Sequence, residues 1–141
     1  MKLFGKRNIA LPNEVRMQYS APSFSFYMGK RFDVADSDGA EKIIKDEGGN
    51  PVVLVHPGIN LLENPAQWVK SLLGASYVVV LGNSNEPYLA SFVNKLEKQI
   101  FSPIPKALAG AIVLEDEKEA AELLLSISSK EKKKCITFFV R

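Results

Sequence analysis

The chain has 141 residues, of which 46% are hydrophobic and 24% are charged, and its formal net charge is +2. This length and composition are those of one globular domain and do not favour a disordered chain. The small net charge creates no field that would collect phosphate backbones or anionic lipid, so we expect neither nucleic acid nor a membrane as a partner.

The cysteine content bears on the compartment. Cys135 is the only cysteine, so it cannot form an intramolecular disulfide, and a lone thiol fits a reducing environment. Polar residues interrupt the basic start before a signal-peptide core could form, and no apolar run reaches the roughly 18 residues of a membrane helix. We therefore predict a soluble, cytoplasmic domain over residues 1–141, with residues 1–14 as a flexible arm.

The first predicted elements are strands. Apolar and polar residues alternate over 15–19, over 24–28 and over 31–34, which is the period of a half-buried strand. Gly29 and Lys30 stand between the last two runs, where glycine can adopt the positive φ of a tight turn. This pattern predicts an N-terminal hairpin.

The rest of the chain alternates helices and strands. Helical periodicity and capping residues predict helices over 36–47, 64–73, 87–100 and 116–127, and apolar runs predict strands over 52–55, 77–81, 111–114 and 135–140. The continuous apolar strands 52–55 and 77–81 are typical of strands covered on both faces, so we expect them to be neighbours at the centre of the sheet. Residues 101–107, with two prolines, predict a connector.

Strands separated by helices need right-handed crossover connections. We therefore predict an α/β fold with a mostly parallel sheet of about five strands, helices on both faces and the hairpin at one edge, a Rossmann-like three-layer sandwich. The units 32–55 and 112–140 also resemble one another. Either they form an internal repeat about a pseudo-twofold axis, or they share only the pattern of any strand-helix-strand unit.

Two loops at predicted strand ends are the candidate site, because ligands of parallel sheets bind beyond the carboxyl ends of the strands. The first follows strand 52–55 and holds His56, Gly58 and Asn60. His56 is the only histidine and can act as an acid, a base or a hydrogen-bond donor that binds phosphate near neutral pH. The alternative is that His56 only shapes a proline-glycine turn, since no nucleophilic or acidic partner is visible beside it.

The second loop follows strand 77–81 and opens a helix. Gly82 permits a close turn, and short polar side chains that can bind a ligand or cap the helix follow it: Asn83, Ser84 and Asn85. The charge of Glu86 opposes anion binding there. Capping alone explains this composition equally well, because both glycine-rich phosphate-binding patterns are missing.

Other chemical signatures fail. One histidine and one cysteine cannot supply a zinc site at the usual spacings, and no Gly-x-Ser-x-Gly elbow exposes Ser84 as a nucleophile. We therefore predict no metal and no cofactor. Cys135 follows a lysine run that could activate an exposed thiol, but a structural cysteine is the favoured interpretation. The turn Lys130 to Lys134 is interpreted as a solvated basic turn rather than a contact for phosphate or an acidic partner.

One segment carries a family resemblance. Residues Pro22 to Arg31, with the helix and strand that follow, are similar in pattern to part of the soluble extension of some lipid-linked-sugar glycosyltransferases. The similarity covers less than half of the chain, and the membrane portion that carries catalysis in those enzymes lies outside it. The resemblance therefore implies no catalytic residue here.

Three functional hypotheses remain open at this point. The first is a small binding or accessory module that takes a small anionic ligand or a protein segment at loops 56–60 and 82–87. The second is an enzyme in which His56 is the general acid or base, with Asn60, Ser84 or Asn85 orienting the substrate. The third is a structural protein that associates with itself or with a partner.

Overall fold

The computed structural model describes residues 29–48, 50–101 and 107–141. Five strands form its sheet, and their bounds are β1 (Lys30–Val34), β2 (Val52–His56), β3 (Tyr77–Leu81), β4 (Gly110–Leu114) and β5 (Cys135–Val140). The helices are α2 (Ser37–Asp46), α3 (Ile59–Glu63), α4 (Pro65–Leu72), α5 (Pro87–Lys98), the short 3-10 helix η3 (Gln99–Phe101) and α6 (Glu117–Glu131). The other half of the predicted hairpin, residues 24–28, lies outside the described residues.

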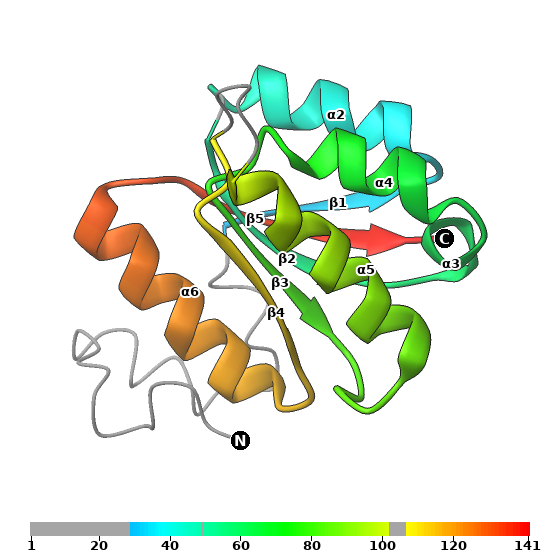
Figure 1. Ribbon diagram of the computed structural model, residues 1–141. Helices are drawn as coiled ribbons and strands as arrows, with labels where there is room; N and C mark the ends of the chain where they lie inside the picture. Colours follow the sequence, from blue (N-terminus) through cyan, green and yellow to red (C-terminus); the bar gives the residue numbers. More distant parts are fainter. Residues whose placement is uncertain (1–28, 49, 102–106) are drawn as a thin grey trace.

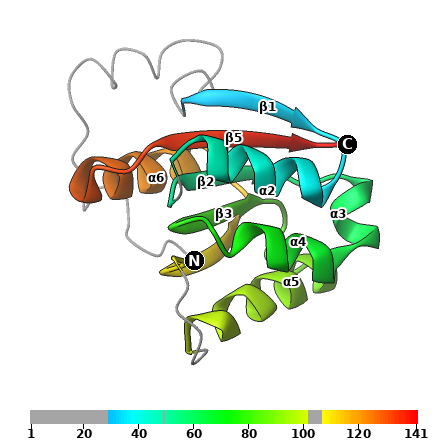
Figure 2. The ribbon, with the colours of Figure 1, turned by 90° about the horizontal axis from the view of Figure 1, so that it is seen from above.

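The sheet is parallel throughout, with the strand order β1-β5-β2-β3-β4 (Figures 1 and 2). The prediction of an α/β fold with a parallel sheet of five strands is confirmed. β2 and β3 are neighbours inside the sheet, with Val53 opposite Val78 and Val55 opposite Val80, as their apolar runs predict. Among the described strands, β1 and β4 form the two edges of the sheet.

The direction of chain travel decides which face each helix covers. The chain moves from β1 through β2 and β3 to β4 in one direction, and α2, α4 and α5 cover one face of the sheet on the way (Figure 1). It returns from β4 to β5 in the opposite direction, and α6 covers the other face. Right-handed crossovers require this change of face when the direction reverses.

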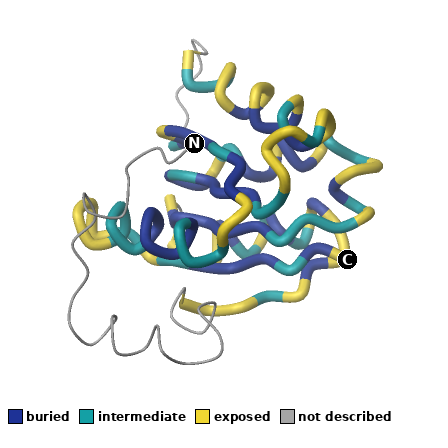
Figure 3. The backbone as a smooth tube through the Cα atoms, turned by 90° about the horizontal axis from the view of Figure 1, so that it is seen from below, coloured by how far each residue is buried: buried dark blue, intermediate teal, exposed yellow. Residues whose placement is uncertain are grey.

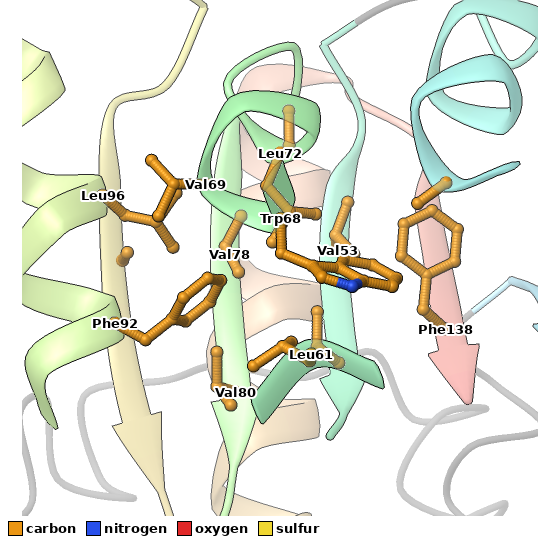
Figure 4. Packing of buried hydrophobic residues seen from close by; sticks show 14 of the residues in the cluster. Val53, Leu61, Trp68, Val69, Leu72, Val78, Val80, Phe92, Leu96 and Phe138 are labelled. Atoms are coloured by element: carbon orange, nitrogen blue, oxygen red, sulfur yellow. The ribbon is translucent and has the colours of Figure 1, made fainter. Parts of the chain in front are cut away.

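Two apolar clusters hold the layers together. On the face of α2, α4 and α5, the large side chains Trp68, Phe92 and Phe138 are almost completely buried (Figure 4). Figure 3 shows that buried backbone is concentrated in the interior of the sheet. On the face of α6, alternate residues of the strands, among them Leu54 and Val79, pack against Ala120 and Leu124. Because successive side chains of a strand point to opposite faces of the sheet, each interior strand contributes residues to both clusters.

The helix ends follow the sequence signals closely. The side chain of Asp36 caps α2 by accepting from the N–H of Gly39 at 2.8 Å, and Asp116 caps α6 by accepting from Lys118 at 2.9 Å. Pro65 is the first residue of α4, as predicted, but Asn64 makes no capping bond there, because its side chain donates to the carbonyl of Asn60. The helix α3, in contrast, is not predicted by the sequence pattern.

The suspected repeat differs in its crossovers. The unit β1-α2-β2 spans one intervening strand, β5, with its helix on one face, whereas β4-α6-β5 spans β3 and β2 with its helix on the other. The two units are thus not placed equivalently in the sheet, which favours the simpler interpretation of a shared supersecondary pattern. Among the described residues, no helix is both long and apolar enough to cross a lipid bilayer.

Candidate functional site

His56 ends β2 on the face of α6 and takes part in an aromatic stack. Its ring lies parallel to that of Phe139, with 4.0 Å between the ring centroids. In β1, on the other side of β5, the guanidinium carbon of Arg31 lies 4.2 Å from the ring centroid of Phe139. Because β1 and β2 flank β5, Phe139 separates Arg31 from His56, and the two side chains do not converge on one ligand.

The surroundings of His56 favour its neutral form. Burial lowers the pKa of the imidazole below its usual 6.5, and the positive charge of Arg31 lowers it further. The Nε2 atom is buried and has no hydrogen-bond partner among the described residues. A general acid or base needs a ring nitrogen within reach of a substrate proton, so this geometry favours the interpretation of His56 as a packing residue.

This environment predicts a specific pH dependence of stability. The unfolded chain takes up the His56 proton near pH 6.5, whereas the folded chain takes it up only at lower pH. The contribution of neutral His56 to the free energy of unfolding is therefore fully present above pH 6.5. It is lost as the pH falls through the pKa of the folded state. We expect His56→Gln to remove this decline in urea unfolding curves measured on both sides of pH 6.5, and an unchanged decline would contradict the assignment.

The other residues of the first loop carry structural contacts. A side chain at Gly58 would place its Cβ 2.1 Å from the carbonyl oxygen of Val140, so the loop packs directly on the end of β5. The side-chain oxygen of Asn60 accepts a hydrogen bond from the indole N–H of Trp68 at 2.8 Å, and its backbone N–H donates to Arg141 at 2.9 Å. These bonds hold α3 and α4 to the sheet.

The second loop is more open. Asn83, Ser84 and Asn85 are all exposed, and the side-chain oxygen of Asn83 accepts from the N–H of Asn85 at 2.8 Å, which closes a local turn. Glu86 caps α5 by accepting from Tyr88 at 3.2 Å. Of the predicted residues in this loop, Ser84 lines a groove between α5 and β4.

The strand order places the loop after β4 beside the loop after β3, which the sequence did not predict. The loop after β3 turns to the face of α5, and the loop after β4, Glu115 and Asp116, turns to the face of α6. In parallel sheets such a reversal leaves a crevice at the carboxyl ends of the two strands. Here Glu86, Glu115 and Asp116 make that end acidic, which disfavours a small anionic ligand.

An open groove lies along β4. It has a volume of about 540 Å³ and runs the full length of the strand, with α5 forming its other wall. Its polar lining comes from Ser84, Asn94, Glu97 and the hydroxyl-bearing ring of Tyr77, and the remainder is mostly apolar. Burial, and then the charge of Glu97, raise the pKa of Tyr77, so this phenol remains a neutral hydrogen-bond donor.

The two edges of the sheet differ in charge. Edge strands commonly carry charged residues that prevent pairing with other chains. β1 follows this rule with Lys30, Arg31 and Asp33. β4, from Gly110 to Leu114, contains no charged residue and no proline.

No other described strand pairs with the outer edge of the β4 backbone. The carbonyl of Leu114 accepts from the N–H of Gly82 at 2.9 Å, so Leu114 directs its polar groups toward β3. Successive residues of a strand point their N–H and C=O groups to opposite sides, which directs those of Ala111 and Val113 away from β3. Among the described strands, β4 has β3 as its single neighbour, so the groups of Ala111 and Val113 face the groove.

Two further sequence candidates, Cys135 and the turn Lys130 to Lys134, have surroundings that suit a structural role. Cys135 is partly buried at the start of β5, its Sγ lies 3.8 Å from the carbonyl of Leu124, and burial raises the pKa of its thiol to about 11. A thiol with so high a pKa is a poor nucleophile at neutral pH. The basic turn surrounds Lys132, which ends α6 in the left-handed conformation, and Lys130, Lys132 and Lys134 are exposed to solvent.

Comparison with known proteins assigns no class to this arrangement. No protein-family model matches the chain, and no curated protein matches it either. The site must therefore be interpreted from its own geometry.

Proposed function

We propose that the protein is an interaction module that binds an extended polypeptide segment by adding it to the sheet beside β4. The observation that carries the proposal is the combination of an uncharged edge strand with an open groove of about 540 Å³ along it. In such strand addition the backbone bonds give affinity, and pockets for alternate side chains give specificity. Ala111 and Val113 would supply the backbone bonds.

The groove also suggests which segment it accepts. Its wall from α5 offers apolar surface at Ala90 and Val93, which suits apolar side chains at alternate positions of the segment. Glu97 and Asn94 interrupt this wall with one carboxylate and one amide. A segment with apolar residues and one donor or cationic side chain is therefore the best match.

The other hypotheses receive less support from the geometry. The buried ring nitrogen and lowered pKa of His56 do not suit an enzyme that uses it as acid or base. The acidic loop ends beside β4 do not suit a small anionic ligand. The interaction with a polypeptide segment is therefore the function to test first.

The proposal predicts binding of a short strand peptide. A fluorescein-labelled peptide with the sequence of residues 109–114 followed by one lysine serves as the probe, because it joins an uncharged strand sequence to the cationic side chain that suits Glu97. Its binding is measured by fluorescence anisotropy. Ala111→Pro removes one outward N–H but no bond to β3, so the fold is retained, since edge strands tolerate proline at such positions. We expect the Kd to rise at least about tenfold, which is roughly 1.4 kcal/mol of binding free energy.

Ala111→Ser is the matched control, because it changes the side chain and keeps the N–H. It should bind the peptide as the wild type does. Val113→Pro gives a second edge variant in case Ala111→Pro fails to fold, as judged by circular dichroism. The proposal is wrong if the wild type does not bind the peptide, or if folded proline variants bind it equally well.

A further inference from the structure

We infer that the segment bound beside β4 carries a basic side chain at each end of an uncharged core that matches the strand in length. The inference rests on the proposed function, because it requires the edge of β4 to accept a strand. It names the class of partner as a segment of another protein in which lysine or arginine flanks a short apolar strand on both sides.

The amino end of β4 lies toward the carboxylate of Glu97. α5 is the crossover helix between the parallel strands β3 and β4, so it runs antiparallel to them and its last turn lies near the start of β4 (Figure 1). Glu97 belongs to that turn and is exposed. It is the only charged side chain among the described residues that line the groove, and Lys95 of the same helix lines a different pocket. This end of the groove therefore attracts a cation.

The carboxyl end of β4 is acidic as well. Glu115 directly follows the strand, is exposed, and forms no ion pair with a described residue. Asp116 and Glu86 each use one carboxylate oxygen to cap a helix, and their negative charges add to that of Glu115. Lys118 is the only basic residue in the two loops and in the first turns of the helices that follow them. Carboxylates therefore outnumber cations at this end also.

The distance between the two acidic ends sets the length of the core. Six consecutive residues, Ala109 to Leu114, line the groove between them. An added strand advances about 3.3 Å per residue, as β4 does, so its core has the same number of residues. Basic residues directly before and after this core then lie toward Glu97 and Glu115. The long stems of lysine and arginine let their charged ends reach the carboxylates.

The two charges are expected to select among segments rather than to supply most of the affinity. Both carboxylates are exposed, and an exposed ion pair contributes little in water. The backbone bonds to Ala111 and Val113 are the same for any extended segment, so they do not distinguish one sequence from another. A segment with one basic residue matches one end of the groove, and a segment with two matches both ends.

Three labelled peptides with blocked termini test this selection. Each has residues 109–114 as its core, flanked by lysine at both ends, by lysine at the carboxyl end alone, or by glutamate at both ends. In fluorescence anisotropy at low salt, we expect the Kd of the two-lysine peptide to be about threefold to fivefold below that of the one-lysine peptide. The two-glutamate peptide should bind most weakly. The differences should shrink in about 0.5 M NaCl, which screens exposed charges.

A charge reversal tests whether the ends of the groove cause the preference. In Glu115→Lys we expect the second lysine to give no gain, and one of the two peptides with a lysine at one end and a glutamate at the other to bind best. Glu131→Lys changes the net charge equally at the far end of α6, and this control should keep the preference of the wild type. Circular dichroism verifies that both variants fold.

The outcomes separate this inference from the proposed function. Equal binding of the one-lysine and two-lysine peptides would overturn the inference and leave strand addition at β4 standing. A gain from the second lysine that persists in Glu115→Lys would also overturn it, because the attraction would then come from elsewhere on the protein. Failure of all three peptides to bind the wild type would contradict the proposed function itself.

Discussion

Replacement of Trp68 by alanine is expected to cost about 3–5 kcal/mol of unfolding free energy, the range for large aromatic residues removed from a core. Trp68 has no exposed surface, and its ring lies over the sheet in one cluster with Leu61 of α3 and Phe138 of β5 (Figure 4). The truncation also removes the indole N–H, and the side-chain oxygen of Asn60 then loses its partner. Urea unfolding followed by circular dichroism measures the loss.

Two further variants are compared with Trp68→Ala: one separates the apolar volume from the hydrogen bond, and the other is an exposed control. Trp68→Phe keeps most of the apolar volume and loses the hydrogen bond to Asn60, so we expect a smaller cost, on the order of 1–3 kcal/mol. Gln67→Ala, at the exposed neighbour in α4, should stay within about 0.5 kcal/mol of the wild type. A loss below about 1 kcal/mol for Trp68→Ala would show that Trp68 does not anchor this core.

Gly58→Ala is expected to destabilise the protein by about 3 kcal/mol or more, at the upper end of the range for overpacking. The backbone of Gly58 is extended, with φ −139°, so conformational strain is not the reason. The added Cβ would meet the carbonyl oxygen of Val140 at 2.1 Å and its carbonyl carbon at 2.8 Å. Bonds from Arg141 to Val34 and from Asn60 to Arg141 hold that end of β5 in place.

Gly39→Ala provides the control for this substitution. Gly39 lies inside α2, and the nearest atom to its added Cβ is the Asp36 side-chain oxygen at 3.3 Å. Alanine is favoured over glycine in a helix by about 1 kcal/mol, which should offset the closer contact with that side chain. If Gly58→Ala unfolds at the same urea concentration as Gly39→Ala, the described packing of loop 56–60 on β5 is wrong.

Much of the fold could be predicted because each layer leaves a local pattern in the sequence. Continuous apolar runs at Val52 to Val55 and Tyr77 to Leu81 identify interior strands, and Asp36 and Asp116 mark helix starts. Strand order leaves no such pattern, because it depends on contacts between distant segments. The position of β5 between β1 and β2 could therefore not be predicted.

The candidate site was predictable only in part, for the same reason. The loop Gly82 to Glu86 carries a polar signature and does lie at the reversal of the sheet. His56 also stands at a strand end, but its stacking on Phe139 depends on the pairing of β2 with β5. The open edge of β4 has no signature of its own, since a strand with the composition of Gly110 to Leu114 is equally compatible with an interior position.

Amide hydrogen exchange of β4, resolved by residue with NMR, tests the proposed docking edge most directly. It is measured in dilute protein and again after saturation with the peptide of residues 109–114 followed by one lysine. We expect the amides of Ala111 and Val113 to exchange fast in dilute protein and to become protected with the peptide, while Ile112 and Leu114 stay protected throughout by their bonds to β3. Unchanged exchange of Ala111 and Val113 at saturation would contradict strand addition at this edge.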